Sequence, residues 1–114
     1  MPGYTHMRAA MPCSFGLWFS AYAEILIDDV ISLNSTIEII NQNTLGSAAG
    51  YGTSFNIDRD FTTNDLNFKT LKYNSLACQI SRNKIEKNTF DTLGNIAFTL
   101  SKISMDICLS LIHI

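Results

Sequence analysis

Charged residues are scarce in this 114-residue chain. Asp, Glu, Lys and Arg make up 16% of it and apolar residues 46%, whereas charged residues are about 25% of an average globular domain. A chain of one domain's length buries only about two thirds of its unfolded surface. The apolar excess therefore indicates faces that are covered by something outside this chain. The formal net charge of −2 gives no basis for general nucleic-acid binding, and we expect no nucleic-acid partner.

Cysteine and histidine are also rare. The three cysteines are odd in number and show no Cys-x-x-Cys spacing: Cys13, Cys78 and Cys108. This pattern disfavours a disulfide framework and predicts reduced thiols in the cytoplasm. The two histidines lie too far from the cysteines along the chain to suggest a metal cluster, so no metal site is expected.

No segment has the pattern of a signal peptide or a membrane span. Residues 1–15 lack the basic start and apolar stretch of a secretory signal. The most apolar run, residues 16–27, contains Glu24 and is followed by two aspartates. Because a spanning helix needs about 20 mostly apolar residues, we interpret this run as part of a core helix and expect no membrane partner.

Apolar residues recur at three- and four-residue steps in two long segments, about 13–41 and about 75–112, which predicts a long helix in each. A glycine-rich loop is expected at 44–59, and a short helix at about 62–68 capped by Thr62 or Thr63. Gly94 is expected to mark a close helix crossing. The sequence thus predicts an all-α fold of long antiparallel helices from a larger helical bundle.

Several motifs in the middle of the chain have an ordinary structural interpretation. Residues 50–53 (Gly-Tyr-Gly-Thr) lack the Gly-Lys-Ser/Thr and the preceding strand of a phosphate-binding loop, so they predict a turn. Residues 57–60 (Ile-Asp-Arg-Asp) predict a helix-entry turn with local ion pairs, and a catalytic carboxylate is the alternative. Residues 69–87 carry five basic side chains, which indicate a solvated face or a surface that holds an anionic substrate.

His6 is the candidate catalytic residue, and Thr5 and Arg82 are the candidate substrate-binding residues. A histidine exchanges a proton near neutral pH, and the adjacent Thr5 hydroxyl can bind a carboxylate. From the residues alone, a structural or surface role for His6 stays the commoner alternative. His113, on the apolar C-terminal helix, is not expected to be a ligand.

Short motifs follow one another in a fixed order within residues 2–12, 17–24, 43–59 and 66–82. This ordered set resembles the argininosuccinate lyases of the aspartase/fumarase superfamily, and residues 2–12 resemble their second signature segment. Tyr4 stands where fumarases and adenylosuccinate lyases usually carry arginine, which favours the argininosuccinate branch. Residues 8–11 and Asn56 depart from the usual pattern of that branch, so the exact substrate stays open.

The resemblance implies a reaction. Argininosuccinate would be cleaved to arginine and fumarate by β-elimination, without a cofactor. One group removes a proton beside a carboxylate and another protonates the departing guanidino nitrogen, which requires positioned groups of suitable pKa. By this resemblance His6 is the catalytic histidine, as the base or as a partner of the acid–base pair, and Thr5 and Arg82 bind substrate.

The resemblance also implies that residues 1–114 are part of a longer enzyme. The first and third signatures of the family, the third carrying a catalytic serine, do not occur in this chain. We therefore expect a partial central helical domain that is inactive alone and belongs to a cytoplasmic homotetramer whose sites form where three subunits meet. The alternatives are another fumarate-releasing lyase of the superfamily, or a non-catalytic helical interaction module, which the broad apolar stripe over residues 93–112 would suit.

Overall fold

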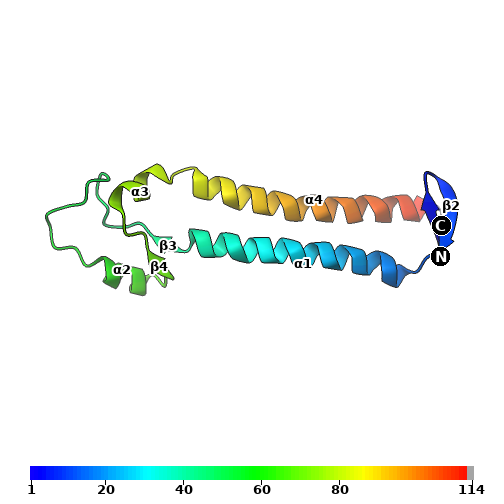
Figure 1. Cartoon of the computed structure of the whole chain (residues 1–114), viewed down its shortest axis with the longest axis horizontal. Helices are drawn as coiled ribbons and strands as arrows, with labels where there is room; N and C mark the ends of the chain where they lie inside the picture. The colour runs from blue at the N-terminus through cyan, green and yellow to red at the C-terminus, as the bar shows by residue number, and fades with distance from the viewer. Residues whose placement is uncertain (113–114) are drawn as a thin grey trace. The chain divides into compact units, whose positions relative to one another are not determined.

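The structure is a computed structural model that describes the backbone of residues 1–112 and the side chains of residues 1–109. The chain forms two compact units: unit 1 is Met1–Ile31 with Gly94–Ile114, and unit 2 is Ser32–Leu93. Figure 1 shows the order of the elements along the chain. The predicted all-α class is confirmed, because two long helices dominate the described residues and none of the strands found there exceeds five residues. The elements are β1 (Pro2–Thr5), β2 (Arg8–Pro12), α1 (Phe15–Ile40), β3 (Gln42–Asn43), α2 (Arg59–Asp65), β4 (Thr70–Leu71), α3 (Ser75–Ile80) and α4 (Lys84–Ile112).

Helix α1 lies close to its predicted range of about 13–41. It begins at Phe15, directly after Ser14, whose hydroxyl accepts a hydrogen bond of 3.1 Å from the Leu17 N–H. Such a bond satisfies one of the free N–H groups at a helix start. The helix then continues for 26 residues to Ile40, a length of about 39 Å.

The second long segment is interrupted, in contrast to the continuous helix expected over about 75–112. Helix α3 ends at Ile80, and α4 begins only at Lys84. Between them Asn83 has a φ of 67°, in the left-handed region that ends a helix and that asparagine tolerates better than most residues. No glycine or proline stands at this break, so the sequence carries no strong signal for it.

In unit 1, hydrogen bonds join the α1 and α4 segments. Asp106 of α4 accepts bonds from Tyr22 Oη at 2.5 Å and from Trp18 Nε1 at 3.4 Å. About two turns further along α1, Asp29 accepts a bond of 2.7 Å from the Thr99 hydroxyl of α4. A step forward on α1 therefore corresponds to a step backward on α4, which confirms the antiparallel arrangement within this unit. The unit also contains the antiparallel β1–β2 hairpin, which the sequence analysis did not predict.

In unit 2, helix α2 covers Arg59–Asp65 rather than the expected 62–68. Its N-cap is Asp58, whose carboxylate accepts a 2.8 Å bond from the Phe61 N–H, so the predicted capping by Thr62 or Thr63 is wrong. The two threonines instead donate to the Arg59 carbonyl within the helix. The predicted helix-entry turn at residues 57–60 is thus confirmed.

The two-residue strands β3 and β4 pair in parallel in unit 2, with Gln42 opposite Thr70 and Asn43 opposite Leu71. This short pairing brings the end of α1 beside the segment that leads into α3. It also places Asn43 at the start of the glycine-rich loop, where its side chain is completely buried.

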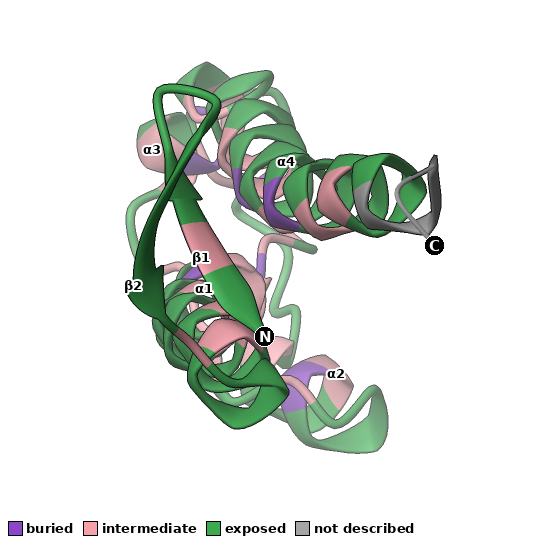
Figure 2. Ribbon diagram, turned by 90° about the vertical axis from the view of Figure 1, so that its right-hand side faces the viewer, coloured by how far each residue is buried: buried purple, intermediate pink, exposed green. Residues whose placement is uncertain are grey.

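Apolar side chains are mostly exposed, as the composition indicates. Among the described residues, Cys78 is the single buried apolar side chain, and the other buried ones are polar. Exposed residues, drawn in green, dominate the hairpin and much of α4 (Figure 2). No described helix is long and apolar enough to cross a membrane. Apart from its chain neighbours and the backbone of its own helix, no described atom lies within 4 Å of a Cβ built on Gly94, so the close crossing expected there is not formed by the described residues.

Candidate functional site

Thr5 and His6 lie at the tip of the β1–β2 hairpin. Thr5 pairs with Arg8 as the last residues of the two strands, so His6 and Met7 form the two-residue loop between them. Their φ angles are 50° and 63°, the left-handed geometry of a type I′ turn, whose twist matches that of a hairpin. Side chains other than glycine enter this region at a cost of roughly 1–2 kcal/mol per residue. The paired strands therefore hold His6 in a backbone conformation that it would not adopt freely.

The hairpin tip is exposed. Both candidate side chains are solvent-accessible, and the neighbouring Met7 is 99% exposed. Within the described part of the chain no hydrogen bond reaches the Thr5 hydroxyl or the His6 imidazole. The tip therefore exposes a hydroxyl and an imidazole from two adjacent residues.

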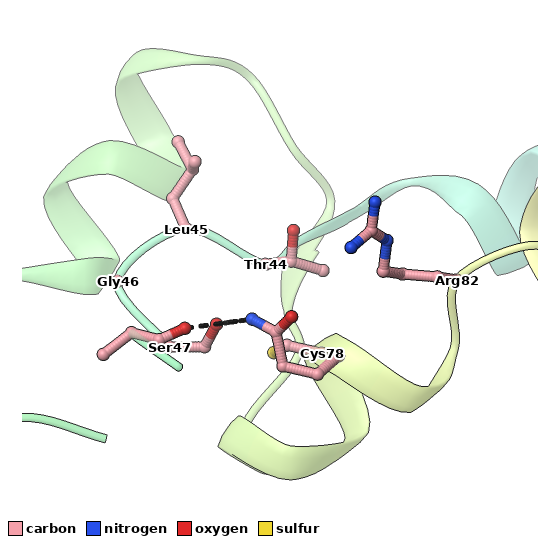
Figure 3. Close-up of a pocket in the computed structure, with 8 residues that line it drawn as sticks. Thr44, Leu45, Gly46, Ser47, Cys78 and Arg82 are labelled. Carbon is pink, nitrogen blue, oxygen red and sulfur yellow. Dashed lines mark hydrogen bonds between the residues drawn. The ribbon is translucent and has the colours of Figure 1, made fainter. Parts of the chain in front are cut away.

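Arg82, the third candidate, belongs to unit 2 and lies at the break between α3 and α4. It lines an open hollow of ≈ 410 Å³, which we call the Arg82 hollow (Figure 3). Its guanidinium points toward Thr44, and no hydrogen bond from it is formed to any described residue. The lining residues are Thr44, Leu45, Gly46, Ser47, Ala48, Cys78, Gln79 and Arg82.

Gln79 of α3 fixes the glycine-rich loop against one wall of the hollow. Its side-chain amide donates to the Ala48 carbonyl at 2.9 Å and to the Ser47 hydroxyl at 3.4 Å (dashed in Figure 3). Ser75, at the start of α3, donates to the Gly50 carbonyl at 2.9 Å. Gly50 and Gly52 have φ angles of 96° and 76°, so the predicted turn at residues 50–53 is confirmed.

Asn43 anchors the beginning of the same loop. Its amide nitrogen donates to the hydroxyls of Thr62 at 3.1 Å and Thr63 at 2.8 Å, and its oxygen accepts from the Leu45 N–H at 2.9 Å. A buried amide is tolerated only when its polar atoms are paired in this way. The Asn43 side chain therefore holds the start of the loop against α2.

Arg59 does not form the local ion pairs expected within residues 57–60. No carboxylate of the described residues lies at ion-pair distance from it; its guanidinium donates instead to main-chain carbonyls, among them Leu45 O at 2.8 Å and Lys72 O at 2.9 Å. Asp58, one of the two acidic neighbours of Arg59, is instead the N-cap of α2. No local sequence pattern indicates this role of Arg59, since the carbonyls that it contacts lie 13 and 14 residues away.

The basic residues of segment 69–87 are not gathered at the hollow. Lys69 pairs with Glu38, and Lys87 pairs with Asp91 one turn further along α4. Both pairs are exposed and contribute little to stability. Arg82 is therefore the basic residue of this segment that lines the hollow.

One titratable group outside these segments is perturbed. The hydrogen bond to the Asp106 carboxylate, followed by desolvation and by the negative charge of that carboxylate, raises the pKa of the Tyr22 phenol above its ordinary value. No group of three or more His, Cys, Asp or Glu side chains suitable for a metal ion occurs among the described residues. His113, which the sequence analysis did not expect to be a ligand, lies outside the described residues.

Comparisons with known proteins agree with this fold. Residues 1–111 match the family described as "Lyase". Proteins called argininosuccinate lyase from Phocaeicola vulgatus and Bacteroides fragilis are 51% and 50% identical over 109 residues, and one from Xylella fastidiosa is 39% identical over 109 residues. Each alignment covers 96% of this chain but 24% of the relative, so the chain spans about a quarter of the length of these curated relatives. The chain belongs to this lyase family.

Proposed function

We propose that this chain is a segment of the central helical domain of an argininosuccinate lyase, which takes part in arginine biosynthesis. The observation that carries the proposal is the identity of 51% with an argininosuccinate lyase along 96% of the chain. The family match over residues 1–111 includes the Thr5–His6 tip and the Arg82 hollow. The reaction is the elimination of arginine from argininosuccinate, which leaves fumarate and needs no cofactor.

The geometry supports distinct roles for the candidate residues. The exposed His6 imidazole takes or gives the proton that is transferred in the reaction, since histidine is the side chain that most often serves as a general acid or base. The carbon–hydrogen bond beside a carboxylate breaks, its electrons form the carbon–carbon double bond of fumarate, and the carbon–nitrogen bond breaks as the guanidino nitrogen gains a proton. The Thr5 hydroxyl binds substrate beside His6, and the Arg82 guanidinium attracts a substrate carboxylate.

The same proposal includes a homotetramer in the cytoplasm. The exposed apolar faces of α1 and α4 support packing against further helices, since large contiguous apolar surfaces mark interaction sites. The three cysteines are free, which accords with a reducing compartment. The 114-residue chain alone is expected to release no fumarate, because His6 and Thr5 have no partner groups from the rest of the enzyme.

The test is fumarate release by the complete enzyme that carries this segment, with His6→Asn compared to His113→Asn. We expect His6→Asn to lower kcat by about 10²–10⁴-fold, the usual range for losing a general acid–base group. His113→Asn is the matched control and is expected to keep the native rate. Equal rates for both variants would remove His6 from the mechanism. Turnover of a different succinyl adduct, but not of argininosuccinate, would assign the enzyme to another lyase of the superfamily.

A further inference from the structure

We propose that Arg59 is a positioning residue for the Arg82 hollow: it holds the loop at residues 44–48 against the segment at residues 72–78. This inference deepens the proposed function and rests on it, because it assumes that Arg82 binds a substrate carboxylate. Arg59 itself does not line the hollow and acts through the shape of its walls.

The hydrogen bonds of Arg59 join two separate parts of unit 2. Nε donates to Leu45 O at 2.8 Å on the loop side. On the other side Nη2 donates to Lys72 O at 2.9 Å and Nη1 donates to Tyr73 O at 3.4 Å. A guanidinium carries five N–H donors in a rigid plane, so one side chain can bind several carbonyls at once. Few other side chains could replace this set of contacts.

The aliphatic part of Arg59 also packs against the loop at Gly46. A Cβ built on Gly46 would lie 2.9 Å from Arg59 Cγ and 3.2 Å from Cδ. Gly46 has a φ of 78°, which glycine adopts without strain. The turn at Gly46 is therefore pressed directly onto the Arg59 side chain, and the position of one depends on the other.

The wall of the hollow opposite the loop contacts the Lys72 carbonyl, to which Arg59 also donates. The Sγ of Cys78, which lines the hollow, lies 3.4 Å from Lys72 O and 3.3 Å from Asn74 O, the two acceptors available to its single thiol hydrogen. Arg59 Nη2 lies 3.8 Å from Cys78 Sγ. Arg59 is thus connected to Leu45 on one wall and to Cys78 on the other, and Arg82 follows Cys78 by four residues.

The decisive variant is Arg59→Lys in the complete enzyme. Lysine keeps the charge but has a compact ammonium group in place of the planar fork, so it cannot reproduce the bonds to both walls. We expect KM for argininosuccinate to rise roughly tenfold while kcat stays within about twofold, because binding is weakened and the proton-transfer groups are unchanged. Hydrogen exchange of residues 45–52 should become faster.

Two further variants separate positioning from stability. Thr36→Val removes the 2.8 Å hydrogen bond between the hydroxyls of Thr36 and Thr92, away from the hollow, and should lower the Tm without changing KM. Arg82→Met removes the group through which Arg59 is proposed to act. On that background Arg59→Lys should raise KM little further, since effects exerted through one group are not additive.

The outcomes are distinguishable. If the native enzyme releases no fumarate from argininosuccinate, the proposed function fails, and the exchange of residues 45–52 still decides whether Arg59 holds the loop. If fumarate is released but Arg59→Lys leaves KM and exchange unchanged, the inference is overturned. A full additive rise in KM in the double variant would also overturn it, because Arg59 would then act independently of Arg82.

Discussion

Units 1 and 2 hold their candidate functional segments by different means. In unit 2, side chains bind the loop that borders the Arg82 hollow: Asn43 at its start, Arg59 beneath it and Gln79 across from it. In unit 1, main-chain pairing forms the hairpin, closed at its base by a 2.8 Å bond from Cys13 N–H to Met1 O. Among the described residues no side chain binds the His6 tip.

The two candidate segments are therefore fixed to different extents. The hollow has its shape in this chain alone, because buried and half-buried side-chain donors already fix the backbone around it. The His6 tip has a defined backbone, but no described residue holds the imidazole by a hydrogen bond. The proposed function requires such a contact, since positioned donors and acceptors make a histidine an effective acid or base.

The largest expected effect on stability tests the hydrogen bonds of Asn43 in unit 2. Asn43→Ala leaves the Leu45 N–H without its 2.9 Å acceptor and removes the donor to Thr62 and Thr63. We expect a loss of about 3 kcal/mol in the free energy of unfolding, since each buried polar group left unpaired costs roughly 1–3 kcal/mol. Urea unfolding of the complete enzyme measures it, and hydrogen exchange locates it at the loop.

Asn64→Ala is the matched control for this prediction. Asn64 is an exposed residue of α2, and substitutions at such sites change the stability by no more than about 0.5 kcal/mol. Equal losses for the two variants would mean that the buried amide is not what holds the loop.

The next effect tests whether close main-chain contact holds the hairpin of unit 1. A Cβ at Gly3 would lie 2.8 Å from the carbonyl oxygen of Met11, a backbone atom that cannot rotate away. Gly3→Ala should therefore cost about 1–3 kcal/mol, the usual range for overpacking, and should speed hydrogen exchange in residues 2–12. Gly16→Ala is the control, because its Cβ would make only a 3.6 Å contact with Ser14 Oγ. Unchanged exchange in Gly3→Ala would contradict a hairpin held by its backbone.

The same contrast explains which elements the sequence could predict. Helices α1 and α4 are visible because their apolar residues repeat at helical spacing. The hairpin is not, because His6 and Met7 occupy a turn whose usual signal is Asn-Gly or Asp-Gly. The break before α4 is hidden for a related reason, since Asn83 takes a left-handed conformation without a glycine or proline beside it.

The sequence likewise predicts only some of the residues of the candidate site. Thr5, His6 and Arg82 follow from the family resemblance, but the residues that shape the hollow do not. Gln79 bonds to Ala48 across 31 residues, and Arg59 bonds to Leu45 across 14. A single sequence contains no local pattern that pairs such positions, because the pairing arises only when the loop folds back onto α3.

The smallest effect concerns the junction of α1 and α4 within unit 1. The hydrogen bond to Asp106 raises the pKa of Tyr22, so the folded state favours the neutral phenol. This contribution to stability is fully present below the ordinary tyrosine pKa of about 10 and is lost as the pH rises through the raised value. Native enzyme should therefore have a higher Tm than Tyr22→Phe at about pH 8, and the gap should narrow above about pH 10. Tyr51→Phe is the control, because Tyr51 is 91% exposed and its Tm should follow the native one at every pH. A difference in Tm that stays constant through the alkaline range would contradict this prediction. It would show that the stabilisation by Tyr22 does not depend on the phenol proton that is donated to Asp106.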